Sequence, residues 1–472
     1  MGAVVALAAL LRLRGLGANG LRIDEIYIVS RSDGPISTLV SHVRETVMGA
    51  PVEFLLRHAV LSFTSREFFL RLPDAVFGTA TVYLLYRLAA RMFDAPTGVL
   101  AALLLAVSRL HVFQSQDARY YALFGLLSVA STLQLLGARE RGGWRPWAAY
   151  ALAMTLGFYT CYFMAFVALV HTLYVLGPLA PPGGEVRSRR AFILSGLATA
   201  LAFAPWAIQY RPNPNIPYPG FEPVVALRTW TAEFANGRGV VEAVAFAFYA
   251  AGIAYAWRAR RPAAVLCVFF VLLPAPIVLG LDIHFRYFFA ARQLIFALPF
   301  FLAAVAYGIV RATRDLSVLA GRPVTQAAAA VALLILASAG LSEPPPQTGN
   351  PAAAREGWRE AASFLLDHVE PGDFIVMTRL PFGPPDGDNI GYYLRTLDDR
   401  RRKFRIVNPA MLGSEGLTWL AAYGRVWCVI ASRPFYEARP ELLRQIDSGF
   451  TKECSFAGGA LFPEIAIYRS GK

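Results

Sequence analysis

Long apolar segments recur along residues 1–343 and are separated by short polar stretches. A helix of about 20 apolar residues crosses the hydrocarbon core of a bilayer. Eleven segments are predicted as membrane spans: 3–11, 68–93, 98–107, 120–136, 147–160, 162–176, 191–208, 240–257, 263–281, 294–310 and 327–341. They predict a polytopic α-helical membrane protein.

The first of these segments is short for a span, because Arg12 and Arg14 interrupt it. Either its helix continues upstream of residue 1, or it is a short, weakly anchored span. A signal peptide is a third interpretation. We disfavour it, because the segment has no basic beginning and no small-residue cleavage site before Asp24.

The overall composition agrees with a membrane chain. Of the 472 residues, 56% are hydrophobic and 16% are charged, whereas soluble domains carry about 25% charged residues. The net charge of +13 fits basic cytoplasmic loops and an anionic partner, so no nucleic-acid partner is predicted. The sequence has no CxxC or Cys/His metal spacing. We therefore predict no cofactor, and the sequence leaves open whether a divalent metal takes part.

Arginines gather at alternate ends of the predicted spans. The groups are Arg87 and Arg91; Arg139, Arg141 and Arg145; Arg187, Arg189 and Arg190; Arg258, Arg260 and Arg261; and Arg311, Arg314 and Arg322. The positive-inside rule places this side in the cytoplasm. Loops 12–67, 108–119, 209–239 and 282–292 then lie outside a cell (plasma or inner) membrane, together with the C-terminal region.

Residues 351–472 are predicted to form a soluble α/β domain. Helices are expected at 355–368, 414–423 and 437–446, and strands at 374–377, 403–407, 426–430 and 465–468. Alternating strands and helices favour a partly parallel sheet. Cys428 and Cys454 lie in this domain, and a disulfide between them is an open alternative if the domain is extracytoplasmic.

Two adjacent carboxylates, Asp24 and Glu25, follow the first apolar segment. Ionisable groups at a membrane boundary are costly, and they are often retained for function. Carboxylates also favour helix N-termini, so capping is the alternative role. Because neighbouring side chains do not both point into one site, one of the two is expected to orient a partner or cap the backbone.

Two other outer loops carry polar clusters. The 108–119 segment and its end contain His111, Gln116, Asp117, Arg119 and Tyr120. The alternative here is an interfacial Asp–Arg anchor with an aromatic belt.

The 282–292 loop contains His284, Arg286 and Arg292. Cations on the side opposite the arginine-rich loops indicate a bound anion such as a lipid phosphate, and snorkelling to ordinary headgroups is the alternative. Glu53 and Arg57 have the spacing of a helical ion pair; alternatively, Glu53 is a further acidic group of the site.

Several stretches resemble the GT-C glycosyltransferases, and within them the branch of the protein O-mannosyltransferases and the aminoarabinose lipid A transferases. The stretches are Asp24-Glu25, Phe69–Pro73, Tyr83–Leu88, Gln116–Leu123, Phe158–Phe163 and Arg292–Pro299. The resemblance covers roughly residues 1–310. It departs from the family at Gly49-Ala50-Pro51, where the family often has His-Pro-Pro, and at Cys161, where the family has His.

The resemblance implies a sugar donor carried on a polyprenyl phosphate and inverting displacement on the extracytoplasmic face. It implies an acceptor there as well: a protein, a lipid or a cell-wall glycan. On this basis we predict the catalytic carboxylates as Asp24, Glu25 and Asp117, with Asp24 as the general base. Donor phosphate binding is assigned to Arg119, Arg292, Arg286 and His284. Other substrate contacts are assigned to Glu53, His111, Gln116 and Tyr120.

The alternative function is a multi-pass lipid or solute transporter without transferase activity. Transporters commonly place charges near the membrane midplane and contain internal repeats. In this chain the charges cluster in the outer loops, and no repeat is evident. A third interpretation is a non-catalytic relative whose soluble domain binds a cell-wall partner.

Overall fold

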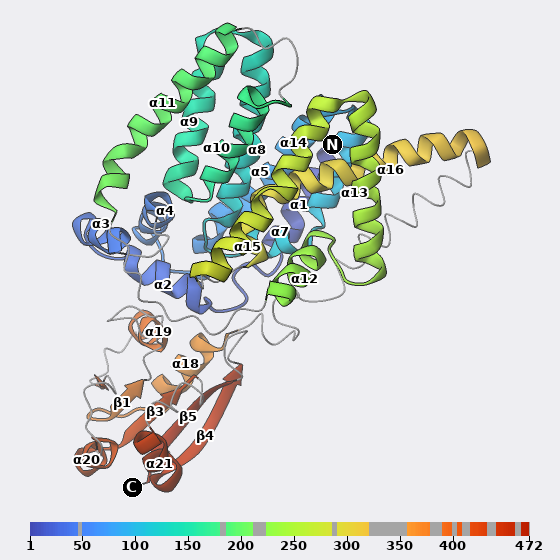
Figure 1. The fold of residues 1–472 in the computed structure, drawn as a ribbon. Coiled ribbons are helices and arrows are strands. Elements are labelled where there is room, and N and C mark those ends of the chain that lie inside the picture. Colours follow the sequence, from blue (N-terminus) through green and yellow to red (C-terminus); the bar gives the residue numbers. More distant parts are fainter. Residues whose placement is uncertain are drawn as a thin grey trace.

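The computed structural model places a small sheet-containing domain at one end of a helical bundle (Figure 1). It describes residues 1–45, 50–179, 186–210, 223–285, 290–320, 356–377, 389–398, 404–407, 416–431, 440–457 and 464–471.

The bundle is formed by helices that follow one another closely in the chain. They are α1 (Gly2–Leu13), α2 (Ile23–Ser32), α3 (Ile36–Glu45), α4 (Pro51–Leu61), α5 (Glu67–Met92), α6 (Ala95–Ala106), α7 (Arg109–Ser115), α8 (Tyr121–Arg141), α9 (Trp144–Thr160), α10 (Met164–Leu176), α11 (Val186–Gln209), α12 (Pro223–Phe234), α13 (Val240–Ala259), α14 (Arg261–Leu272), α15 (Pro274–Phe285), the 3-10 helix η1 (Ala291–Ala297) and α16 (Leu298–Ala320).

The multi-pass character is confirmed, but the count of eleven spans is not. Within the described residues, six helices are long and apolar enough to cross a membrane, or seven if α6 and α7, bent by 62°, form one broken span. The helices α1, α9 and α10 have 12, 17 and 13 residues, fewer than the roughly 20 of a full span. The predicted span 327–341 lies outside the described residues.

Two of the arginine-rich helix ends, those of α5 and α8, meet away from the sheet-containing domain. Helix α5 starts beside that domain, where Glu67 pairs with Arg359, and runs for 26 residues. Near its other end, Arg91 pairs with Glu140 at the end of α8. This arrangement agrees with the alternating pattern seen in the sequence.

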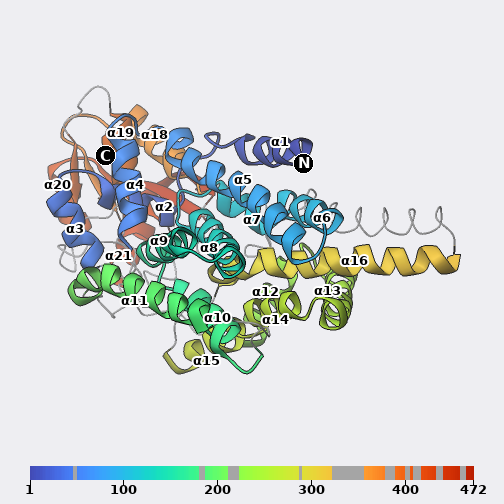
Figure 2. The ribbon, with the colours of Figure 1, turned by 90° about the horizontal axis from the view of Figure 1, so that it is seen from above.

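Helix α16 begins among the other helices, near α8 and α12, and its far end projects beyond the bundle, as the view from above shows (Figure 2). In the span Ala291–Leu316, 94% of the most apolar 18-residue stretch is buried inside the protein. Its close approach to α13 depends on glycine, because a Cβ on Gly308 would lie 2.1 Å from the carbonyl oxygen of Phe248. Small residues let membrane helices pack at such short range. The packing fixes η1, and with it Arg292, at the start of this helix.

The C-terminal domain contains a five-stranded sheet in the order β2-β1-β3-β5-β4. Its elements are α18 (Trp358–His368), β1 (Phe374–Met377), α19 (Asn389–Leu397), β2 (Arg405–Val407), α20 (Gly416–Tyr423), β3 (Val426–Ile430), α21 (Pro440–Gly449), β4 (Phe450–Ala457) and β5 (Glu464–Ser470). Strand β1 pairs in parallel with β2 and β3, whereas β5 pairs antiparallel with β3 and β4.

This sheet is partly parallel, as predicted, and four of its strands occupy the expected segments. Strand β4 was missed, because Thr451, Lys452 and Glu453 give it the polar character of an exposed edge strand. The disulfide alternative is wrong: Cys428 and Cys454 are both free. They lie on β3 and β4, and β5 runs between these two strands.

Candidate functional site

The helix α2 holds the two adjacent carboxylates in its first turn. It lies between two apolar clusters. Ile26 and Val29 pack with the C-terminal domain, and Ile28 packs with Phe54 of α4. This burial on two sides fixes the rotation of α2 about its axis. As a result, the side chains of Asp24 and Glu25 point into different surroundings.

Glu25 is fully buried and acts as a structural anchor. Its carboxylate accepts hydrogen bonds from Arg71 at 2.8 and 2.6 Å, from Ala118 N–H at 2.8 Å and from Arg22 N–H at 2.8 Å. The last bond caps α2, so the capping alternative holds for this residue. Burial opposes ionisation, but Arg71 outweighs it and lowers the pKa of Glu25 to about 2. In this position it holds α2, α5 and the loop before α8 together.

Asp24 differs from its neighbour because its side chain remains 35% exposed. Its carboxylate lies 3.3 Å from Nη2 of Arg292 and 3.6 Å from Nη1 of Arg119. Burial alone would raise its pKa, but the charges of Arg292 and then Arg119 outweigh burial and lower it. Asp24 is therefore an accessible, ionised carboxylate between two cations whose positions in the sequence are 173 residues apart.

Glu53 holds Arg119 in place, and the ring of Tyr121 lies against both arginines. Glu53 accepts from Nε of Arg119 at 2.8 Å and from the backbone N–H of Tyr120 at 3.2 Å. The ring centroid of Tyr121 lies 5.8 Å from the guanidinium carbon of Arg119 and 5.7 Å from that of Arg292. Aromatic faces attract cations at this range. Glu53 is thus an acidic group of the site, and it does not pair with Arg57, which contacts Asp74 instead.

Three further predicted residues lie outside this arrangement. Asp117 is only 2% exposed and pairs with Arg22. His111 is fully buried, and its Nδ1 lies 2.7 Å from Nη2 of Arg12. Gln116 donates to three backbone carbonyl oxygens at the end of α1, at 2.9–3.1 Å. His111 and Gln116 thus link α7 and the residue after it to α1, whereas Asp117 links the loop before α8 to the start of α2. Their closest contacts are with these residues and not with Asp24.

Tyr120 borders the site through its neighbour Tyr121. It is 7% exposed and its ring packs against that of Tyr121, with 4.3 Å between centroids. Arg286 and the side chain of His284 lie outside what the structure describes, so their assignment to phosphate binding stays a prediction.

Sequence reasoning missed Arg71 and Tyr121 as parts of the site. Arg71 carried a usable signal, because an arginine near the start of an apolar span needs a partner. Tyr121 carried none, since an aromatic residue at a span end also fits an interfacial belt. Among the described residues, no group of three or more His, Cys, Asp or Glu side chains gathers as a metal ligand set.

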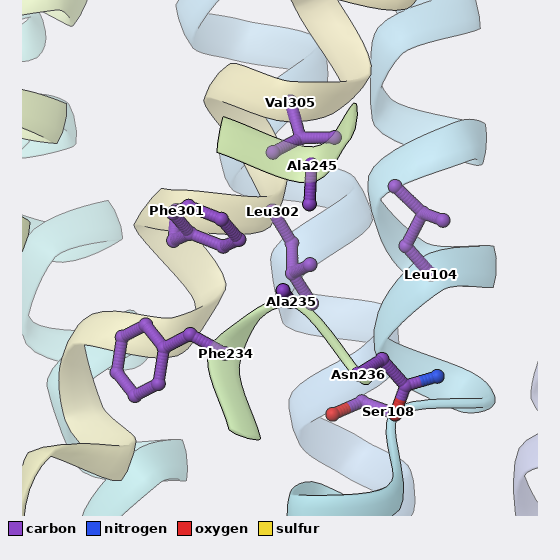
Figure 3. Close-up of a pocket in the computed structure, with 9 residues that line it drawn as sticks. All are labelled: Leu104, Ser108, Phe234, Ala235, Asn236, Ala245, Phe301, Leu302 and Val305. Atoms are coloured by element: carbon purple, nitrogen blue, oxygen red, sulfur yellow. The ribbon is translucent and has the colours of Figure 1, made fainter. Parts of the chain in front are cut away.

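A separate pocket lies between α6, α13 and α16 (Figure 3). Its lining consists of Leu104, Ser108, Phe234, Ala235, Asn236, Ala245, Phe301, Leu302 and Val305. The side-chain oxygen of Asn236 accepts from the backbone N–H of Arg109 at 2.7 Å, which ties the turn after α12 to the break between α6 and α7. The residues around Asp24 do not line this pocket.

Comparison with known proteins gives one family match. Residues 50–208 match the model of the dolichyl-phosphate-mannose-protein mannosyltransferase family. This segment contains Glu53, Asp117 and Arg119, whereas Asp24 and Arg292 lie outside it. The search of the curated proteins found no match.

Solved structures share the fold over nearly the whole chain. ArnT from Cupriavidus metallidurans, in the apo state, is 13% identical with a TM-score of 0.60, and the match covers 99% of this chain and 97% of that one. The same protein bound to undecaprenyl phosphate gives a TM-score of 0.58 at 13% identity, with the same coverage.

A more distant match is the oligosaccharyltransferase AglB from Archaeoglobus fulgidus, in complex with an inhibitory peptide and a dolichol-phosphate. It is 13% identical with a TM-score of 0.53, and the match covers 96% of this chain and 73% of that one. The family match over residues 50–208 and the shared fold agree with the resemblance drawn from the sequence: this chain has the fold of ArnT and AglB, and part of it is similar to the mannosyltransferase family.

Proposed function

We propose that this protein transfers a sugar from a polyprenyl-phosphate donor to an extracytoplasmic acceptor by inverting displacement, with Asp24 as the general base. The acceptor is a protein, a lipid or a cell-wall glycan. The observation that carries the proposal is the accessible carboxylate of Asp24 beside Arg292 and Arg119, at 3.3 and 3.6 Å. Its neighbour Glu25 is fully buried and has a structural role instead.

The proposed reaction has one displacement step. The acceptor hydroxyl oxygen forms a bond to the anomeric carbon while the bond from that carbon to the phosphate oxygen breaks. The electron pair of the broken bond leaves with the polyprenyl phosphate, and the hydroxyl proton passes to the Asp24 carboxylate. Arg119 and Arg292 stabilise the charge that develops on the phosphate.

Donor binding also adjusts the strength of the base. In the structure, both arginines direct their charge at Asp24 and lower its pKa, which weakens a carboxylate as a proton acceptor. A donor phosphate brings negative charge to the same two guanidinium groups. The pKa of Asp24 then rises toward its ordinary value, so the carboxylate becomes a stronger base once the donor is bound.

The solved relatives support the choice of donor. The ArnT structure contains undecaprenyl phosphate, and the AglB structure contains a dolichol-phosphate. Both are polyprenyl-type lipid phosphates, and both proteins share this fold. The arginine-rich helix ends at the far end of the bundle support an extracytoplasmic position for Asp24 and the C-terminal domain, in a plasma or inner membrane.

The experiment mixes purified protein with native envelope extract and a panel of undecaprenyl-phosphate hexoses and pentoses. We expect one donor to yield a glycosylated product with inverted anomeric configuration. A parallel assay in liposomes without acceptor measures movement of the lipid phosphate between leaflets. Lipid movement without any sugar transfer would favour the transporter alternative and contradict the proposal.

A further inference from the structure

The beginning of α2 depends on the C-terminal domain for hydrogen-bond acceptors. The first N–H groups of a helix have no partner within it. At α2, the N–H of Ile23, the first helical residue, donates to Oε2 of Glu356 at 2.6 Å. Just before the helix, the N–H of Leu21 donates to the hydroxyl of Tyr393 at 2.5 Å. Both acceptors are more than 330 residues away along the chain. Asp24 is the next residue after Ile23.

The two acceptors are themselves held in place. Glu356 is 7% exposed, and the same carboxylate oxygen accepts from Nε1 of Trp358 at 2.7 Å. Tyr393 of α19 is 1% exposed, and its hydroxyl donates to Glu67 at the start of α5 at 3.2 Å. Trp358 and Tyr393 also belong to the apolar cluster that packs against Ile26 and Val29 of α2.

Another contact joins the same two parts of the protein without touching α2. Arg359 pairs with Glu67 at 3.2 Å and donates to the carbonyl oxygen of Ala18 at 2.7 Å. It lies in the same helix, α18, as Trp358. A change at Arg359 therefore weakens docking of the C-terminal domain but leaves Glu356, the acceptor of Ile23, in place. This difference provides a matched control.

We propose that the C-terminal domain positions the catalytic carboxylate, with Glu356 as a positioning residue that fixes the first turn of α2. The inference rests on the proposed function. A loss of the Ile23 hydrogen bond frees the first turn and moves Asp24 relative to Arg292. A misplacement of about 1 Å at a reacting group costs on the order of 100-fold in rate. The domain thus contributes to the chemical step through Asp24, and phosphate binding by the arginines does not depend on it.

The test compares three full-length variants in lipid nanodiscs: Glu356→Ala, Glu356→Gln and Arg359→Ala. Glutamine keeps a side-chain oxygen that accepts the Ile23 N–H, whereas alanine removes it. The measurements are kcat and KM with the most active donor of the panel, the affinity for undecaprenyl phosphate and the thermal unfolding temperature.

We expect Glu356→Ala to lower kcat by at least about tenfold, with affinity for undecaprenyl phosphate within about threefold of the wild type. We expect Glu356→Gln to keep kcat within about threefold. Arg359→Ala is expected to lower the unfolding temperature but to keep kcat within about twofold, because Arg359 does not contact Glu356.

Two results overturn the inference: a folded Glu356→Ala variant with wild-type kcat, or an Arg359→Ala variant that loses as much kcat as Glu356→Ala. If Glu356→Ala does not fold, Tyr393→Phe takes its place, because it removes one hydroxyl and keeps the ring. An unchanged kcat in Tyr393→Phe would then overturn the inference. A wild-type protein that transfers no sugar would overturn the proposed function as well, so the two failures are distinguishable.

Discussion

The buried pair of Arg71 and Glu25 provides a quantitative prediction about what holds the site together. Arg71 donates two hydrogen bonds to Glu25, and it also donates to the carbonyl oxygens of Leu16, Asn19 and Gly20 at 2.8–3.1 Å. Replacement by methionine removes all of these donors. It leaves the Glu25 carboxylate buried with two backbone N–H partners and without a hydrogen-bonded cation.

The expected cost is large because the carboxylate has no access to water. Removal of one partner from a buried ion pair costs about 3–5 kcal/mol. Arg91 in the same helix provides a matched control. It forms a bidentate ion pair with Glu140, whose side chain is 64% exposed. Solvent-exposed pairs contribute about 0–1 kcal/mol, so Arg91→Met is expected to cost less than about 1 kcal/mol.

The assay is a denaturant titration of the purified variants, followed by tryptophan fluorescence, with the free energy of unfolding extrapolated to zero denaturant. The double variant Glu25→Gln/Arg71→Met is expected to recover about 1–3 kcal/mol relative to Arg71→Met alone, since the uncompensated charge is gone. Equal costs for Arg71→Met and Arg91→Met would refute the assignment of Glu25 as a buried anchor.

Three further predictions concern the site. Arg119→Ala and Arg292→Ala should each weaken undecaprenyl-phosphate binding by about 10- to 100-fold, because a charge-assisted hydrogen bond contributes about 1.5–3 kcal/mol. The control variant Arg261→Ala, at the far end of the bundle, should bind like the wild type. Isothermal titration calorimetry measures both affinities. Because the two arginines lower the pKa of Asp24, its carboxylate stays ionised at pH values below the ordinary carboxylate pKa. It becomes protonated, and activity falls, only as the pH drops through the lowered pKa. The acid limb of kcat/KM should therefore move to higher pH in Arg292→Ala. Burial raises the pKa of Glu356 from 4.5 to about 7, so its contribution to stability is complete below about pH 4.5 and is lost as pH rises through about 7. The loss is about 3 kcal/mol, and Glu356→Gln should flatten the unfolding free energy measured across that range.

The sequence predicted the parts of this fold that depend on local pattern. Apolar length identified the long spans, and alternation of short strands and helices identified the partly parallel sheet. The predicted count of eleven spans is not confirmed, because apolar segments such as α1 and α10 end after 12 and 13 residues. Apolar composition alone does not reveal where a helix stops, because the end is set by contacts with other helices.

The site was predictable to a similar degree. Asp24, Arg119 and Arg292 were named from outer-loop position and family resemblance, and the structure brings them together. The separate environments of Asp24 and Glu25 were not predictable, because they depend on the rotation of α2, which packing on two sides sets. The support from Glu356 was not predictable either, since that contact joins residues 333 positions apart and leaves no local pattern.

The most direct test of the account is the Asp24→Asn variant, which keeps the size and shape of the side chain and removes its ability to accept a proton. We predict that sugar transfer falls by about 10²–10⁴-fold, the usual contribution of a general base. Undecaprenyl-phosphate binding should persist, because Arg119 and Arg292 remain. A folded Asp24→Asn protein that transfers sugar at the wild-type rate would contradict the account.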